Sequence, residues 1–182
     1  MKTQIDKTSF LKRLCSALML ALIIAMPAAA KKKYKFDTEH SYSVMQINSA
    51  KQGTVMVKAW AVDKNPDKAI EQAKMDAVAA ILFTGANPDP RKAGMGISGV
   101  RALSSKTDYM NHKEFFDNFF TSGDFMMYVQ DINADYPSGE NNIKVPKGRK
   151  VGINLIILYD ALRKLLEENG IIESLDSHFQ IN

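Results

Sequence analysis

The chain has 182 residues and a formal net charge of +4, but four of its 24 basic and one of its 20 acidic residues lie in the first 30 positions. The remaining 152 residues, a typical size for one domain, therefore carry a net charge of +1. This removes the main electrostatic support for a nucleic-acid partner. The one cysteine, Cys15, lies in the same N-terminal segment, so the rest of the chain excludes disulfides and thiolate sites.

Residues 1–30 have the pattern of an export signal peptide. The basic residues Lys2, Lys7, Lys12 and Arg13 precede an uncharged run over 14–30 that is short for a membrane span. Pro27 interrupts this run before three alanines, a pattern that predicts cleavage after Ala30. The expected product is periplasmic or secreted and has no stable membrane span. Three lysines at 31–33 follow at once and can slow export, so an uncleaved anchor is the alternative.

Residues 31–43 are polar and unpatterned, which predicts a mobile leader, and a short strand is expected over 43–50. A second strand, over 54–62, is rich in β-branched and aromatic residues. Its alternation divides the side chains between two faces of a sheet. The core face holds Val55, Val57, Ala59 and Ala61, and the opposite face holds Met56, Lys58 and Trp60.

The stretch NPDKAIEQAKMDAVAAILFTG predicts a helix over 66–84 whose charges all lie at or before Asp76. Asn65 suits the N-cap, Pro66 suits the first helical position, and Gly85 suits a left-handed stop. Alanines at 69, 73 and 77 allow close approach to a sheet. No residue from Ala77 onward is charged, so we expect the second half of the helix to be nearly enclosed.

Residues 86–107 are rich in Gly, Pro and Ser, which predicts a long loop with a short strand near Val100. Asn111 and Glu114 have the spacing of a capping box and predict a second helix that stops near Gly123. This helix carries a stripe of phenylalanines at 115, 116, 119 and 120. Burial of the stripe in the core is the default interpretation, and an exposed binding edge is the alternative.

The last third of the chain predicts strands over 124–131 and 149–159, separated by a turn-rich stretch and a basic hairpin tip at 144–150. A short helix capped by Asp160 and ended by Gly170 follows, and 173–182 is expected to be a tail. The order β-α-α-β-β-α predicts one α+β domain over 44–172. Its sheet should be small and mostly antiparallel, with helices packed on one face.

Several motifs of the sequence bear on possible chemistry. G-x-G-x-x-G at 94–99 lacks the preceding strand and following helix of a dinucleotide site, so no nucleotide site is predicted. His40, His112 and His178 lack metal-ligand spacing, and Asp37, Glu39 and His40 are assigned to the polar leader. No nucleophile, base and orienting group occur together. We therefore predict no enzyme activity, no cofactor, no metal and no catalytic residue.

The chain resembles uncharacterised secreted proteins of Gram-negative bacteria in four segments that cover most of 53–171: GTVMVKAWAVDKNPDKAIEQAKMDAVAAILFTG, KEFFDNFF, GDFMMYV and VGINLIILYDALRKLLEENGI. The strand followed by an Ala-rich helix also resembles, more distantly, small envelope domains of a flagellar accessory protein and of outer-membrane-associated lipoproteins. These resemblances imply a non-catalytic part of an envelope assembly. Leu14 precedes Cys15 where a lipoprotein needs a small residue, so the chain departs from the lipoproteins in lacking a usable lipid-attachment site.

The sequence thus predicts a non-enzymatic periplasmic or secreted module that binds another cell-envelope protein or a second copy of itself. The alternative is a small-ligand or glycan-binding protein that uses the Gly-rich loop 86–105. In the strand over 149–159, Val151, Ile153, Leu155 and Ile157 should line the core, and few helices remain to cover the other face of the sheet. We expect a docking patch there, unless the leader or a loop covers it. Its expected members are Met56, Lys58, Trp60, Tyr128, Asn154 and Ile156.

Overall fold

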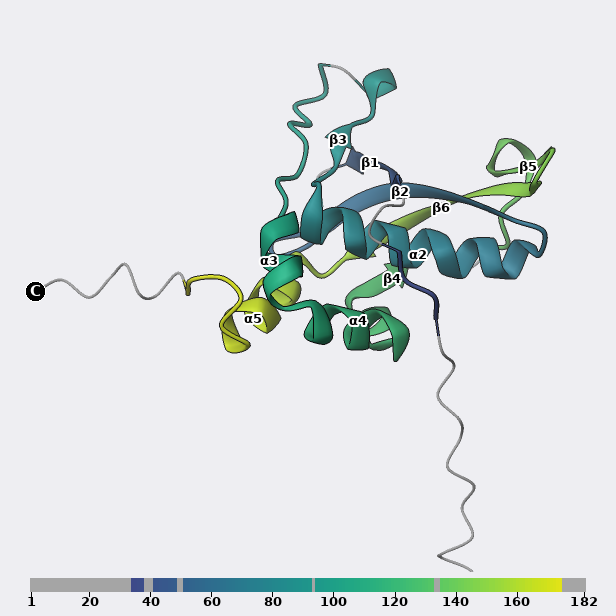
Figure 1. The fold of residues 1–182 in the computed structure, drawn as a ribbon. Coiled ribbons are helices and arrows are strands. Elements are labelled where there is room, and N and C mark those ends of the chain that lie inside the picture. Colours follow the sequence, from purple (N-terminus) through teal and green to yellow (C-terminus); the bar gives the residue numbers. More distant parts are fainter. Residues whose placement is uncertain (1–33, 38–40, 49–50, 93, 133–134, 175–182) are drawn as a thin grey trace, which may run out of the picture. The chain divides into compact units, whose positions relative to one another are not determined.

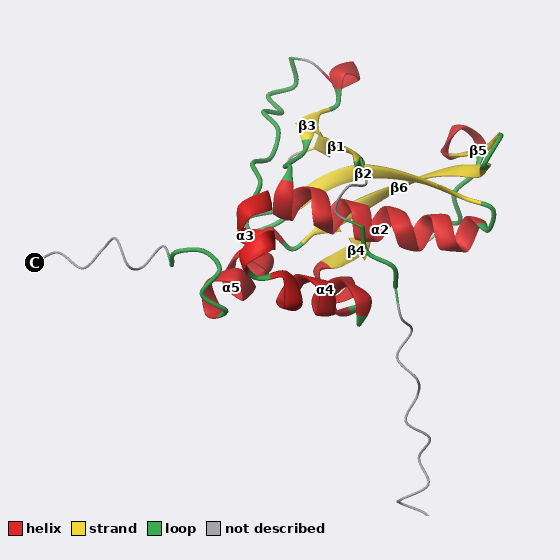
Figure 2. Ribbon diagram, viewed as in Figure 1, coloured by secondary structure: helices red, strands yellow, loops and turns green. Residues whose placement is uncertain are grey.

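A computed structural model of the chain describes residues 34–37, 41–48, 51–92, 94–132 and 135–174. The predicted signal peptide, its cleavage site and most of the predicted tail lie outside these residues. The described part is an α+β domain, as predicted (Figure 1). Helices pack on one face of a mostly antiparallel sheet (Figure 2).

The sheet has six strands, and its two longest members form the centre. These strands are β1 (Ser43–Asn48), β2 (Val55–Asp63), β3 (Asn87–Pro88), β4 (Val129–Asp131), β5 (Asn142–Val145) and β6 (Gly148–Ile157). Their order is β3-β1-β2-β6-β4, and β5 also pairs with β6, beside β4 along the same edge. Only the contact between β1 and β3 is parallel. The strands predicted over 43–50 and 54–62 are therefore confirmed as β1 and β2, although residues 49 and 50 lie outside the described residues.

Helix α2 (Pro66–Phe83) lies across the inner face of the sheet, and its local signals act as predicted. The Asn65 side chain accepts a hydrogen bond from the Asp67 amide at 2.8 Å, and Pro66 opens the helix. Gly85 adopts a φ of 75°, the left-handed conformation that ends the helix. Residues 77–82 are all buried, so the uncharged half is indeed enclosed by the core.

The alternation of β2 and β6 places the predicted side chains in the core. Val57, Ala59 and Ala61 of β2 are buried, as are Val151, Ile153, Leu155 and Ile157 of β6. These strands pair directly, with Ala59 opposite Ile153 and Val57 opposite Leu155. The small side chains of β2 face the alanines of α2, which lets helix and sheet approach closely.

The second helical region differs from its prediction at its start. It consists of α3 (Lys106–Asn111) and α4 (Lys113–Thr121), and the capping box is formed by Ser105 and Asp108. Asn111 is the last residue of α3, and the chain continues into α4 without a separate side-chain cap. The predicted cap at Asn111 is therefore wrong. The signal S-x-x-D at 105–108 was present six residues earlier.

The strand predicted over 124–131 is only partly present. Residues Asp124–Tyr128 form the 3₁₀ helix η2, and pairing begins at Val129. The reason is that β6 ends at Ile157, the partner of Val129, so earlier residues have no strand to pair with. Phe125 instead turns into the core and is fully buried.

The last helix, α5 (Tyr159–Glu168), begins two residues earlier than predicted. Its N-cap position is Leu158, and Asp160 lies in the first turn without acting as the side-chain cap. The Asp160 amide donates to the Gly53 carbonyl at 3.1 Å, which ties the helix start to the turn before β2. Gly170 ends the helical region with a φ of 65°, as predicted.

The predicted mobile leader is fixed in part, because its aromatic residues enter the core. The Phe36 ring stacks on Phe120 with centroids 3.9 Å apart, and the Tyr34 ring meets Phe125 edge to face at 5.2 Å. The Tyr34 amide also donates to the Thr121 carbonyl at 3.1 Å. Two aromatic residues in a polar segment therefore extend the domain beyond its predicted start at residue 44.

Candidate functional site

The candidate site is the face of the sheet opposite α2, which we call the outer face. Its central residues are Met45, Met56, Lys58, Trp60, Lys150, Gly152, Asn154 and Ile156. They come from β1, β2 and β6, whose register brings Met45 opposite Lys58 and Trp60 opposite Gly152. The apolar members of this group lie outside the hydrophobic core cluster.

Trp60 is held in place by the absence of a side chain at Gly152. A Cβ atom added to Gly152 would lie 2.5 Å from the Trp60 Nε1 and 2.7 Å from its Cδ1. The indole therefore lies directly on the β6 backbone, and only glycine leaves room for it. This contact fixes a half-buried tryptophan on a rigid strand.

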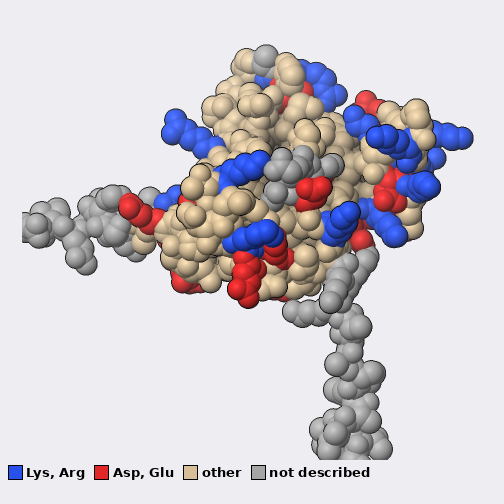
Figure 3. All heavy atoms as spheres, viewed as in Figure 1, with Lys and Arg blue, Asp and Glu red and all other residues tan. Residues whose placement is uncertain are grey.

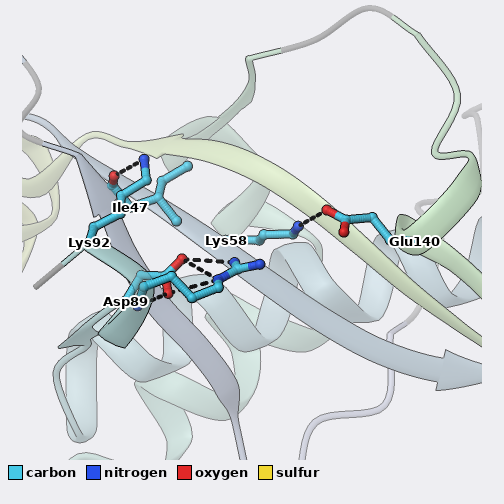
Figure 4. Close-up of polar contacts among 6 residues, drawn as sticks. Ile47, Lys58, Asp89, Lys92 and Glu140 are labelled. Atoms are coloured by element: carbon cyan, nitrogen blue, oxygen red, sulfur yellow. Dashed lines mark hydrogen bonds and ion pairs between the residues drawn. The ribbon is translucent and has the colours of Figure 1, made fainter.

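Lys58 lies beside Trp60 but is only 8% exposed. Its Nζ is 5.0 Å from the centroid of the Trp60 ring and 3.8 Å from Oε1 of Glu140, in the 3₁₀ helix η3 (Gly139–Asn141) (Figure 4). The Lys150 Nζ is 6.0 Å from the same ring. The tryptophan thus has ammonium groups close to its π system, an arrangement that a cation–π attraction favours.

A second loop flanks the outer face beside β1. Asp89 is 2% exposed. Its carboxylate accepts hydrogen bonds from the backbone amide, Nε and Nη2 of Arg91, at distances from 2.8 to 3.3 Å. These bonds hold the pKa of Asp89 at about 2. The Lys92 Nζ donates to the Ile47 carbonyl at 2.6 Å, which anchors the same loop to β1 (Figure 4).

The two flanking loops are electrostatically linked. The Asp89 hydrogen bonds raise the pKa of Arg91 most, and the carboxylate of Glu140 adds to this effect. Glu140 therefore lies within the electrostatic reach of Arg91 as well as of Lys58. Charged groups of both loops thus border the apolar centre of the face.

Five of the six predicted patch residues meet on this face. Met56, Trp60, Asn154 and Ile156 are half-buried, so the face is less open than the sequence suggested. Lys58 is buried rather than exposed, because Trp60, neighbouring side chains and the Glu140 loop enclose it. The alternative of a loop that folds over the patch is thus realised in part.

Tyr128 does not join the patch, which corrects the prediction. It lies at the end of η2, and its ring is 5.7 Å from that of Phe119 in α4. It also packs against the hydrophobic core cluster. The alternation rule failed at Tyr128 because the residue is not in a strand.

The sequence reasoning missed Gly152, Glu140, Asp89 and Arg91. Gly152 carried a usable signal, since an isolated glycine inside a strand pattern often marks the close approach of another group. Glu140, Asp89 and Arg91 carried no such sequence signal, because they reach the face on loops that are distant from it in sequence.

The alternative function would place a pocket at the Gly-rich loop 86–105, which the structure describes except for residue 93. Gly94, Gly96 and Gly99 have positive φ angles, and the stretch after Gly99 forms a bridge from Val100 to Ala86. Three surface hollows, of about 400, 260 and 670 Å³, take their lining residues from other segments. The loop borders the outer face through Asp89 and Arg91 instead.

A hydrogen-bonded cluster of Tyr109, Lys113 and Asp117 joins α3 to α4. The Tyr109 hydroxyl donates to the Asp117 carboxylate at 2.7 Å, and the Lys113 ammonium pairs with the other carboxylate oxygen. Burial, followed by the Asp117 hydrogen bond, raises the pKa of Tyr109, so its phenol stays neutral. The hydrogen bonds of this cluster therefore connect the two short helices α3 and α4.

Within the described ranges, no group of three or more histidine, cysteine, aspartate or glutamate side chains lies close enough to hold a metal ion. His40 and His178 are outside those ranges, as is Glu39. None of the described helices has the length and apolar character needed to cross a bilayer. No protein family, curated protein or solved structure matches the chain.

Proposed function

We propose that this protein is a non-enzymatic module of the bacterial cell envelope, periplasmic or secreted, that binds another envelope protein through the outer face. The observation that carries the proposal is the position of Trp60, whose indole lies on Gly152 in the sheet face opposite α2, outside the hydrophobic core cluster of the described residues. Tryptophan is among the residues most enriched at the energetic centres of protein interfaces.

The surroundings of Trp60 support the same role. Met45, Met56 and Ile156 supply adjacent apolar surface, and charged side chains border it. An apolar centre inside a polar rim is the usual anatomy of a protein interface. Because β2 and β6 pair over nine residues, the face needs little reorganisation on binding.

Site-specific photo-cross-linking in the organism's own envelope tests this function. A benzophenone amino acid in place of Met56 should cross-link a defined envelope protein, whereas the same group in place of Met110 should not. Met110 is a matched control, because it is 64% exposed and lies in α3. Trp60→Ala should abolish the Met56 cross-link while the protein stays folded. A Met56 cross-link that persists unchanged in Trp60→Ala, or that joins only two copies of this chain, would overturn the proposal.

A further inference from the structure

The outer face continues into a groove of about 670 Å³, which we call the Trp60 groove. Its volume is in the range of typical binding sites. One wall comes from the segment before β1 and the other from the tip of the β5–β6 hairpin, with the end of β2 between them. The lining residues are Ser41, Ser43, Trp60, Ala61, Val62, Gln72, Val145, Pro146, Lys147 and Lys150.

The end of β2 offers an open strand edge to this groove. The Ile132 amide donates to the Asn154 carbonyl, and the Leu158 amide donates to the Tyr128 carbonyl. The backbone N–H and C=O groups of even-numbered residues in β6 thus point toward β4, so those of odd-numbered residues point toward β2. By the same alternation, the backbone groups of Val62 point toward the β1 side, where pairing stops at Ser43 opposite Trp60.

Val62 is 44% exposed, so its edge is accessible to another chain. An extended peptide can add to such an edge through backbone hydrogen bonds. Trp60, Val62, Val145 and Pro146 would meet its apolar side chains. Four aliphatic residues of the lining, Ala61, Val62, Val145 and Pro146, offer apolar contacts to such side chains.

The charge of the groove is positive. The hairpin residues 141–150 include three lysines and one arginine and no acidic residue. Figure 3 shows Lys and Arg side chains gathered around this hairpin, at the right of the view. The Arg149 guanidinium donates hydrogen bonds to the side-chain oxygen of Asn142 at 2.6 Å and to its backbone carbonyl at 3.0 Å. No carboxylate of the described residues lies within ion-pair distance of Lys147 or Lys150, so both are available to a ligand.

From the open edge, the apolar lining and the two lysines together, we infer that the Trp60 groove binds an extended, acidic segment of the partner protein. This inference rests on the proposed function and specifies the partner. The segment adds to the Val62 edge of β2, its apolar side chains contact Trp60 and the hairpin, and its carboxylates pair with Lys147 and Lys150.

Fluorescence titration with a synthetic probe tests the inference, because Trp60 is the single tryptophan of the chain. The probe is an acetylated octapeptide of alternating glutamate and valine. It should change the Trp60 emission saturably, and binding should weaken as salt is raised. Lys147→Gln combined with Lys150→Gln should lower the affinity roughly tenfold, since two exposed ion pairs are lost. Lys144→Gln is the matched control for each of these substitutions made singly, because it also removes one positive charge from the hairpin but lies outside the groove.

Three results of the titration would overturn the inference. The first is the absence of saturable binding of the octapeptide, and the second is a loss of affinity in Lys144→Gln equal to that in either single substitution. The third is equal or tighter binding of polygalacturonate or of anionic phospholipid vesicles, which would assign the groove to a glycan or a membrane. A Trp60-dependent cross-link from Met56 that the double lysine substitution leaves unchanged would refute this inference and leave the proposed function standing. A positive titration without any Met56 cross-link would refute the proposed function and leave only the binding of acidic peptides by the groove standing.

Discussion

Trp60 and Gly152 form a cross-strand pair, and the indole of Trp60 requires a glycine at position 152. The indole occupies the space that a Cβ atom at position 152 would fill. In Gly152→Ala, the indole must therefore move away from the β6 backbone. We expect a red shift of the Trp60 emission and a loss of roughly 1 kcal/mol of unfolding free energy.

A double-mutant cycle provides the control for this pair. In Trp60→Ala, the extra methyl group at position 152 meets no indole, so Gly152→Ala should then cost less than it does beside tryptophan. Chemical denaturation of the four proteins measures both effects. Additive costs would show that the close contact between Trp60 and Gly152 does not exist in solution.

Asp89 links the acid stability of the fold to the loop beside the outer face. Arg91 holds its folded-state pKa at about 2, against an ordinary value of 3.8. A carboxyl with a lowered pKa stabilises the fold above its unfolded pKa, and this stabilisation is lost as the pH falls through the folded value. The Tm of the wild type should therefore fall more steeply between pH 4 and 2 than that of Asp89→Asn. Parallel Tm curves for the two proteins over this window would contradict the assigned pKa.

At the scale of elements, the start of α3 offers a direct choice between two caps. Ser105 Oγ accepts from the Asp108 amide at 3.1 Å, and the Asp108 carboxylate accepts from the Ser105 amide at 2.8 Å. Ser105→Ala should cost about 1 kcal/mol of unfolding free energy. Asn111→Ala should be nearly neutral, because Asn111 is exposed and does not cap a helix. Denaturation curves with the opposite ranking would restore the cap predicted from the sequence.

The same contrast explains which elements could be predicted from the sequence. The signals of α2 are local, since Asn65, Pro66 and Gly85 act on the backbone next to them. The β2 and β6 faces were also predictable, because alternation needs only that both strands are straight. The 3₁₀ helix η2 was not predictable in this way, because its conformation depends on where β6, more than twenty residues later, comes to an end.

The candidate site, too, could be predicted from the sequence only in part. Alternation placed Met56, Trp60, Asn154 and Ile156 on one face, and the structure agrees. It did not reveal that Lys58 is buried, since that depends on Glu140 and on packing between separate segments. Tyr128 was misplaced because a rule for strands was applied to a helical turn.

At the scale of the whole molecule, the aromatic core reaches from the N-terminal segment to α4. Phe36 stacks on Phe120, so Phe36→Ala should cost roughly 2 kcal/mol of unfolding free energy. Lys35→Ala should change stability by only a few tenths of a kcal/mol, because Lys35 is exposed. Equal stabilities for the two variants would show that 34–37 are not part of the folded domain.

The packing of Tyr34 and Phe36 also bears on the cleavage that the sequence predicts. The sequence predicts cleavage after Ala30, which leaves three lysines before Tyr34. Cleavage beyond Phe36 would remove both rings from their contacts with Phe125 and Phe120. We therefore expect the mature protein to begin at Lys31 and to be soluble without detergent, as N-terminal sequencing and intact mass of the exported form would establish. A mature chain that begins after Phe36, or one that keeps the residues before Ala28, would contradict this expectation.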